Sequence, residues 1–199
     1  LKRAFGLTIA EGVNTLQGDI DYAAAMQDMP SGYKNVITEV TRANYMYAIN
    51  SSTLSNKATK TDELNDFQQN VAAQKDNDRI KQNIYVNGYA SPDGPEKFND
   101  KLSAERSNAG KRAAEKLLKG MELDIDAASY GEDWAGFREL VAASDIEDKE
   151  LILSVLDSYN SSSERENQIK NMSQVFSALK DEILPQLRRA QLVNSSDIT

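Results

Sequence analysis

Five polar residues in the middle of the chain are spaced so that they could bind a charged ligand together. Ser91 and Asp93 belong to the turn sequence Ser-Pro-Asp-Gly. Asn99, Ser103 and Arg106 follow at i, i+4 and i+7, which places them in one stripe of a helix. Arginine offers a planar fork of N–H donors that suits a carboxylate. Because the stripe begins near the turn, the spacing predicts that the Arg106 guanidinium lies close to Ser91 and Asp93. The alternative is an ordinary solvated helix face that carries an arginine.

A strand, a tight turn and a long helix must position these residues. Residues 84–90 alternate with period two and include β-branched and aromatic side chains, which is typical of a strand. Pro92 and Gly94 then favour a turn, and Pro95 suits the first position of a helix, where its missing N–H needs no partner. The helix is expected to end at Leu118. Its apolar side, which we expect to lie on a sheet, consists of Phe98, Leu102, Ala109, Ala113 and Leu117.

Hydrophobic periodicity predicts three further strands and a second helix for the same domain. Residues 36–49 alternate as a strand whose parity changes midway, which indicates a bulge or a new pairing partner. Residues 61–74 form a helix that starts with Thr61 as its cap. Residues 123–131 and 188–193 alternate as the third and last strands.

Helical patterns fill the stretch 134–185, between the third and last strands. The sequences Ser144-x-x-Glu147 and Ser163-x-x-Glu166 are capping boxes that indicate two helix starts. The last helix carries an apolar stripe of Ile169, Met172, Phe176, Leu179 and Ile183. We expect such stripes to form a core; the alternative is a surface that binds a partner.

Composition narrows the classes of function. The 199 residues are 40% hydrophobic and 27% charged, as in a soluble globular protein. The net charge of −8, without a run of Lys or Arg, argues against nucleic acid or an anionic membrane as partner. The chain has no Cys and no His, which removes thiol nucleophiles, disulfides, imidazole bases and the usual zinc sites. No apolar run approaches the roughly 20 residues that cross a bilayer.

We also expect no metal and no cofactor. Asp124 and Asp126 could be imagined as metal ligands, but they alternate with apolar residues as on a half-exposed strand. The chain starts at Leu1 and shows no signal peptide, so we expect a processed chain or a piece of something larger.

The turn and the helix resemble the signature of the OmpA-like C-terminal domain family. That signature is a strand ending in Gly-x-Thr-Asp-x-x-Gly, then a helix carrying Asn-x-x-Leu-Ser-x-x-Arg-Ala. Residues 88–94 and 99–106 match it in spacing without a gap. The Arg-Arg pair at 188–189 is similar to the final strand of that fold. The resemblance covers residues 41–193 and is strongest at 84–118.

The resemblance implies an α+β fold, a two-layer sandwich with a mixed sheet of about four strands in β-α-β-α-β order and a helical insertion before the last strand. The domain is expected at 41–194, with the insertion at 134–185. Residues 1–40 are expected to be a lead-in segment, which could be the end of an upstream domain, and residues 195–199 a tail.

The resemblance also implies a non-enzymatic module of the Gram-negative cell envelope, in the periplasm and associated with the outer membrane. In the family, the motif Asp and Arg hold the diaminopimelate group of the peptidoglycan peptide stem. Arg106 matches that Arg, Ser91 stands in the place of the Asp, and the nearest acid is Asp93. The expected ligand-binding residues are Arg106, Asn99, Asp93, Ser91 and Ser103. Two versions stay open: the site still holds a peptide stem, or it has lost its ligand and the module is a scaffold for other envelope proteins or flanking domains.

Two further function classes are weighed against this one. A protein-interaction domain would use the helical insertion as its binding surface. A hydrolase would need a pair of carboxylates, such as Glu132 and Asp133, with Tyr130 or a lysine nearby. Without His or Cys, no set of nucleophile, base and orienting residue can be assembled from the sequence, so we expect no enzyme.

Overall fold

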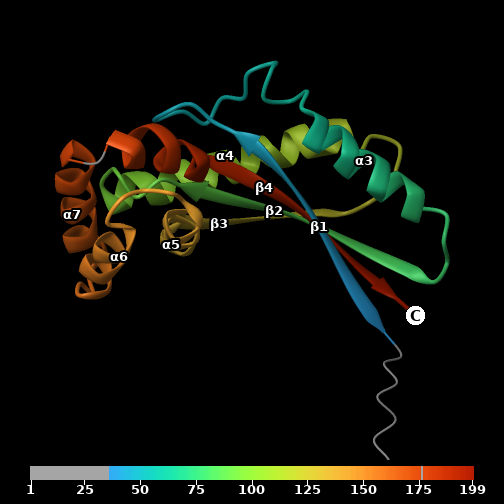
Figure 1. Cartoon of the computed structure of the whole chain (residues 1–199). Coiled ribbons are helices and arrows are strands. Elements are labelled where there is room, and N and C mark those ends of the chain that lie inside the picture. The colour runs from blue at the N-terminus through green and yellow to red at the C-terminus, as the bar shows by residue number, and fades with distance from the viewer. Residues whose placement is uncertain (1–35, 176) are drawn as a thin grey trace, which may run out of the picture. The chain divides into compact units, whose positions relative to one another are not determined.

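The structure of the protein is a computed structural model that describes residues 36–175 and 177–199 (Figure 1). The expectations for the lead-in segment up to residue 35, and for Phe176, lie outside this part. The strands are β1 (Ile37–Met46), β2 (Ile80–Ala90), β3 (Ile125–Glu132) and β4 (Arg189–Ile198). The helices are α3 (Asp62–Gln74), α4 (Glu96–Leu117), α5 (Trp134–Ala143), α6 (Lys149–Asp157) and α7 (Ser162–Val175), followed by a π-helical turn η1 (Leu179–Ile183) and a 3-10 turn η2 (Leu184–Leu187).

The four strands form one mixed sheet in the order β1-β4-β2-β3. The last strand, β4, lies between β1 and β2 and is antiparallel to both, whereas β2 and β3 are parallel. Helices α3 and α4 lie together on one face of this sheet (Figure 1). The predicted α+β class, the β-α-β-α-β order and the helical insertion before the last strand are therefore confirmed.

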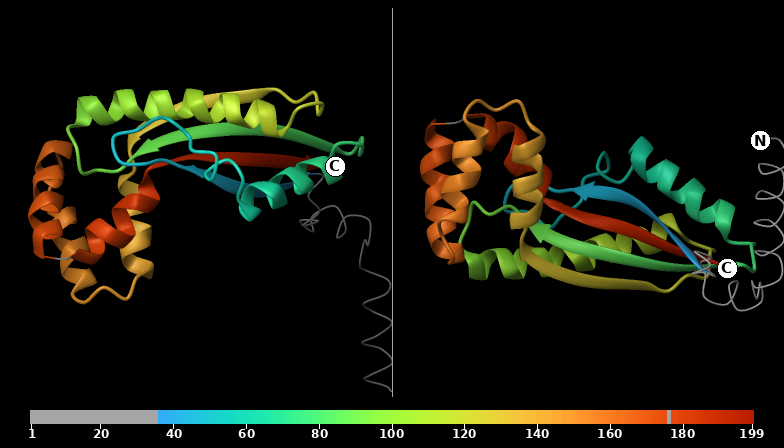
Figure 2. Two further views of the ribbon diagram at one scale, coloured as in Figure 1. Left: turned by 90° about the horizontal axis from the view of Figure 1, so that it is seen from above. Right: turned by 60° about the horizontal axis from the view of Figure 1, so that its bottom comes forward.

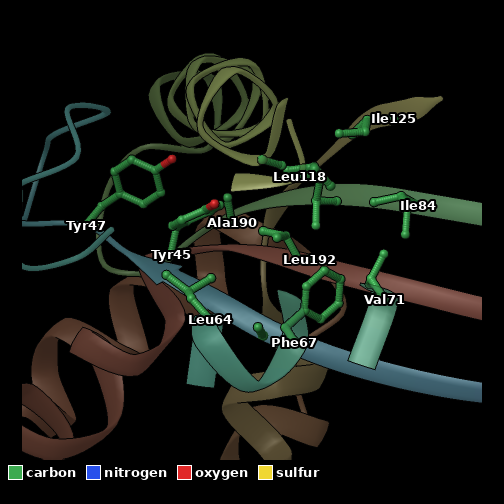
Figure 3. Close-up of a cluster of buried hydrophobic side chains, with 13 residues drawn as sticks. Tyr45, Tyr47, Leu64, Phe67, Val71, Ile84, Leu118, Ile125, Ala190 and Leu192 are labelled. Atoms are coloured by element: carbon green, nitrogen blue, oxygen red, sulfur yellow. The ribbon is translucent and has the colours of Figure 1, made fainter. Parts of the chain in front are cut away.

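The hydrophobic core of the sandwich lies between the sheet and these two helices. Helix α3 begins at the predicted cap, where the Thr61 hydroxyl accepts a hydrogen bond of 3.3 Å from the Leu64 N–H. Leu64, Phe67 and Val71 are buried against the sheet, as periodicity predicts (Figure 3). Strand β1 contributes Tyr45, which is 1% exposed and lies in the same cluster.

Strand β4 extends further than the predicted range 188–193, whereas strand β1 is shorter than the predicted range 36–49. Strand β4 runs on to Ile198 through the expected tail, because Ser195 pairs with Val40 of β1 on one side and Asn83 of β2 on the other. Two partners compensate for the low strand propensity of the Ser-Ser-Asp sequence. Strand β1 pairs with β4 in unbroken register, so the parity change is not a bulge. The domain limits expected at 41 and 194 fall inside these strands.

Helix α4 turns a different side to the sheet than its apolar residues suggested. Phe98 is 43% exposed, and Ala109, Ala113 and Leu117 are half-buried at the side of the helix. The buried positions are instead Asn99, Leu102, Ser103, Arg106, Ser107, Gly110 and Ala114. Small residues allow the helix backbone to approach the sheet closely. A Cβ on Gly110 would lie 2.8 Å from the Ala190 Cβ, so the helix lies almost directly on the strands.

The helices between β3 and β4 gather at one end of the sheet (Figures 1 and 2). They form a second cluster of buried residues: Phe137, Val141, Ile152, Leu153, Leu156, Ile169, Leu179, Ile183, Leu184 and Leu187. The apolar stripes of the insertion are thus a core, as expected. In residues 36–175 and 177–199, no helix has both the length and the apolar character that crossing a membrane requires.

Both predicted capping boxes are wrong in position. Helix α6 begins at Lys149, whereas Ser144 follows the end of α5 and its hydroxyl donates to the Val141 carbonyl at 2.7 Å. The start of α7 is capped by Ser161, whose Oγ accepts from the Glu164 N–H at 3.3 Å and donates to the Glu164 carboxylate at 2.7 Å. A run of three serines offers several cap registers, and sequence alone does not distinguish them.

The close contact between α4 and β2 predicts the effect of adding one methyl group. An alanine Cβ at position 88 would lie 2.7 Å from the Ser107 backbone nitrogen and closer still to the Ser103 carbonyl oxygen. Gly88→Ala is therefore expected to lower the free energy of unfolding by about 1–3 kcal/mol, measured by urea denaturation. The matched control is Ser129→Ala, at the exposed position that pairs with Gly88 on β3. Equal stability of the two variants would contradict this packing.

Candidate functional site

Strand β2 ends at a corner formed by Ser91 to Gly94, and Asn99 on the first turn of α4 holds this corner in place. The Asn99 Nδ2 lies 3.2 Å from the Ser91 carbonyl oxygen and 2.9 Å from that of Gly94. It also lies 2.9 Å from the Glu132 Oε1 at the end of β3. Asn99 is 3% exposed. Its buried amide therefore fixes the turn, the helix and the neighbouring strand relative to one another.

Arg106 lies beside this corner, as the spacing predicts, but its donors are directed at backbone. The Nε donates to the Ser51 carbonyl at 2.9 Å, Nη1 to that of Tyr89 at 3.0 Å and Nη2 to that of Ala48 at 3.2 Å. The side chain is 1% exposed, so the alternative of a solvated helix face is wrong. The guanidinium joins α4 to the end of β2 and to the segment that follows β1.

An aromatic ring completes the surroundings of this buried charge. The guanidinium carbon of Arg106 lies 5.3 Å from the centre of the Tyr47 ring, and the Tyr47 hydroxyl donates to the Arg106 carbonyl at 3.0 Å. Burial, with a smaller contribution from the charge of Arg188, lowers the pKa of Arg106 to about 10, although Tyr47 and Asp93 oppose this change. Arg106 therefore remains a cation at neutral pH.

Ser91, Asp93 and Arg188 form a connected polar cluster on the outer side of the corner. The Ser91 hydroxyl donates to the Asp93 Oδ1 at 2.5 Å. From the start of β4, Arg188 donates to the Ser91 Oγ at 3.2 Å and to the Asp93 Oδ2 at 3.1 Å. The side chains of Arg188 and Asp93 are 11% and 24% exposed, so both reach solvent. With Arg106 behind them, the corner combines two guanidinium groups with one carboxylate.

Arg188 was not among the expected site residues. It lies 95 residues after Asp93 in the chain, and only the strand order β4-β2 brings the two together. The signal in the sequence is the Arg-Arg pair, which the resemblance assigns to the final strand and not to the site.

Ser103 is the expected site residue that faces away from the corner. It is fully buried, its hydroxyl donates to the Asp100 carbonyl at 2.8 Å, and it accepts from the Gly131 N–H at 3.0 Å. It thereby links α4 to β3. The structure brings Ser91, Asp93, Asn99 and Arg106 together at the corner and assigns Ser103 to the contact between helix and sheet.

The carboxylate pair that a hydrolase would need is engaged in structural contacts. Asp133 caps α5 by accepting from the Gly136 N–H at 2.8 Å, and its other oxygen accepts from the Arg189 Nη2 at 2.6 Å. Glu132 accepts from the Trp134 indole N–H at 2.9 Å and from Asn99. Both acids hold the insertion against the sheet, and Asp133 is 6% exposed.

The solved structures that are similar to the chain include a lipoprotein and an OmpA-like domain. No family model and no curated protein matches the chain. The chain is similar to the peptidoglycan-associated lipoprotein from Burkholderia pseudomallei, with 16% identity over 76% of this chain and 88% of that one and a TM-score of 0.42. It is also similar to the OmpA-like domain of FopA1 from Francisella tularensis subsp. tularensis SCHU S4, with 16% identity over 81% and 74% of the two chains and a TM-score of 0.41.

The fork-like contacts of Arg106 predict that a lysine cannot replace it. Lysine keeps the charge, but a single ammonium cannot reach three carbonyls that lie in a fan around a planar group. Arg106→Lys is expected to lower the free energy of unfolding by about 2–4 kcal/mol, because buried carbonyls lose their donors. Arg112→Lys, on an exposed part of the same helix, is the control and should change stability by less than about 0.5 kcal/mol. A similar small change in both variants would rule out the structural role of the fork.

Proposed function

We propose that the protein is a non-enzymatic module of the Gram-negative cell envelope with an OmpA-like fold, and that it associates with peptidoglycan through the β2–α4 corner. The ungapped motif at 88–106 and the sheet order β1-β4-β2-β3 with a helical insertion support this assignment. A periplasmic location associated with the outer membrane follows from the same resemblance. Flanking domains or other envelope proteins complete the assembly in which the module works.

The observation that carries the proposal is the position of Asp93. A zwitterionic amino-acid centre, such as that of diaminopimelate, needs a carboxylate for its ammonium group and a cation for its own carboxylate. Ser91 is neutral and cannot supply the first, but Asp93 lies within 2.5 Å of the Ser91 hydroxyl. The carboxylate missing at position 91 is thus supplied from two residues further along the turn.

The cation that faces the ligand in this proposal is Arg188. Arg106 is 1% exposed, and its N–H groups donate to three backbone carbonyls. Its role is therefore to stabilise the corner from the interior of the domain. Arg188 reaches solvent beside Asp93, and its charge is only partly balanced, because the buried Arg106 adds a second positive charge nearby. The ligand carboxylate would therefore meet Arg188 first.

The insertion is a less favoured binding surface. Its apolar stripes pack against one another in a core of their own, within the part of the chain that the structure describes. We therefore propose that it braces the corner, to which Glu132 and Asp133 connect it through Asn99 and Arg189.

Calorimetric titration with a muropeptide that contains diaminopimelate tests this function. We expect heat of binding from the wild-type protein and affinity weaker by about tenfold or more for Asp93→Asn, since the ligand ammonium loses its counter-charge. Arg188→Gln should weaken binding in the same way. Asp124→Asn is the control, because Asp124 is exposed and lies just before β3, at the end of the sheet away from the corner.

Thermal unfolding of each variant separates loss of binding from loss of fold. Absence of heat with the wild-type protein, or equal affinity in Asp93→Asn, would overturn the binding site and leave the module as a scaffold.

A further inference from the structure

A cavity beside helix α4 lies away from the corner and plays no part in the proposed function. The second half of the helix and the segment 52–60 line an open cavity of about 590 Å3. Two of its lining residues, Arg112 and Lys116, follow Arg106 by six and ten residues, which is about 9 and 15 Å along the helix axis. The cavity is therefore separate from the cluster of Ser91, Asp93 and Arg188.

The rim of this cavity is positively charged on a protein that is acidic overall. Lys60, Arg112 and Lys116 line it, and its lining includes no Asp or Glu, although the chain carries a net charge of −8. Within residues 36–175 and 177–199, none of these three cations forms a salt bridge. Three uncompensated cations around one hollow favour an anion.

Part of the wall of the cavity is apolar. Ala109, Ala113 and Leu117, the residues that were expected to lie on the sheet, line the cavity together with Leu54 from the facing segment. These half-buried side chains offer an aliphatic surface that neither the sheet nor α3 covers completely. A ligand body of hydrocarbon would bury it.

The hydroxyl of Tyr45 adds a directional contact. Tyr45 is 1% exposed as a whole residue and lines the cavity. Figure 3 shows the ring in the core cluster, with its oxygen at the outer end of the side chain. Burial raises the pKa of Tyr45 to about 12, so that the hydroxyl keeps its proton and can donate. The cavity therefore offers an O–H donor to a ligand.

We propose that this cavity is a binding site for a small anionic amphiphile, a molecule with one carboxylate or phosphate head and a short aliphatic body. The head lies among Lys60, Arg112 and Lys116, and the body lies along Ala109, Ala113 and Leu117. A volume of about 590 Å3 is within the range of sites that hold small molecules. The site is independent of peptidoglycan binding at the corner.

Titration of the 15N-labelled protein with octanoate tests the site by NMR. We expect concentration-dependent shifts of the amide signals of Leu54, Ala113 and Leu117. Octanol, which has the same body without charge, and acetate, which has the head without the body, should each bind about tenfold more weakly or not at all. Octyl phosphate in place of octanoate shows which anionic head is preferred.

Two variants distinguish this site from general attraction of anions. Arg112→Glu should weaken octanoate binding by about tenfold or more, whereas Lys101→Glu makes the same charge change on an exposed part of α4 and should leave binding unaltered. Ala113→Phe should block the cavity without a change in charge. Equal binding of octanoate and octanol, equal loss in both charge variants, or shifts confined to residues outside the cavity would each overturn the proposal. Muropeptide binding should be the same in Arg112→Glu and in the wild type.

Discussion

The buried guanidinium of Arg106 is the interaction on which the architecture of this domain depends. It is the largest fully buried side chain among the described residues, and taking a charge out of water costs several kcal/mol. Three backbone carbonyls and the face of Tyr47 offset that cost. Through these hydrogen bonds, the Arg106 side chain joins helix α4, the end of β2 and the segment after β1. Without it, that segment would lose its main polar connection to the sandwich.

The cation requires that α4 lie very close to the sheet, and the sequence of the helix meets that requirement. Gly88 and Gly110 remove the side chains that would hold the two layers apart. Asn99 and Ser103 use their buried polar groups to bond to the corner and to β3. These contacts hold Asp93 and Arg188 in a fixed arrangement, and such preorganisation would reduce the entropy lost in the binding that we propose.

Local patterns predicted the parts of this fold that are decided locally. Period-two alternation identified the strands, and the Ser-Pro-Asp-Gly turn with Pro95 identified the entry into α4. The cap at Thr61 is also as predicted. The most deeply buried side of α4 could not be predicted from hydrophobicity, because it carries small residues and a buried arginine, whereas Ala109, Ala113 and Leu117 are only partly buried against the core. The pairing of Arg188 with Asp93 depends on the strand order, which no local pattern contains.

The most direct test of this account is the exchange rate of the arginine side-chain Nε–H groups, measured by 1H–15N NMR near neutral pH. The Nε–H of Arg106 is hydrogen-bonded to the Ser51 carbonyl and shielded from water, so it should exchange on the order of a hundredfold more slowly than that of the exposed Arg138. Equal exchange rates for Arg106 and Arg138 would show that the guanidinium is not held in the core, and the structural basis of the corner would then be wrong.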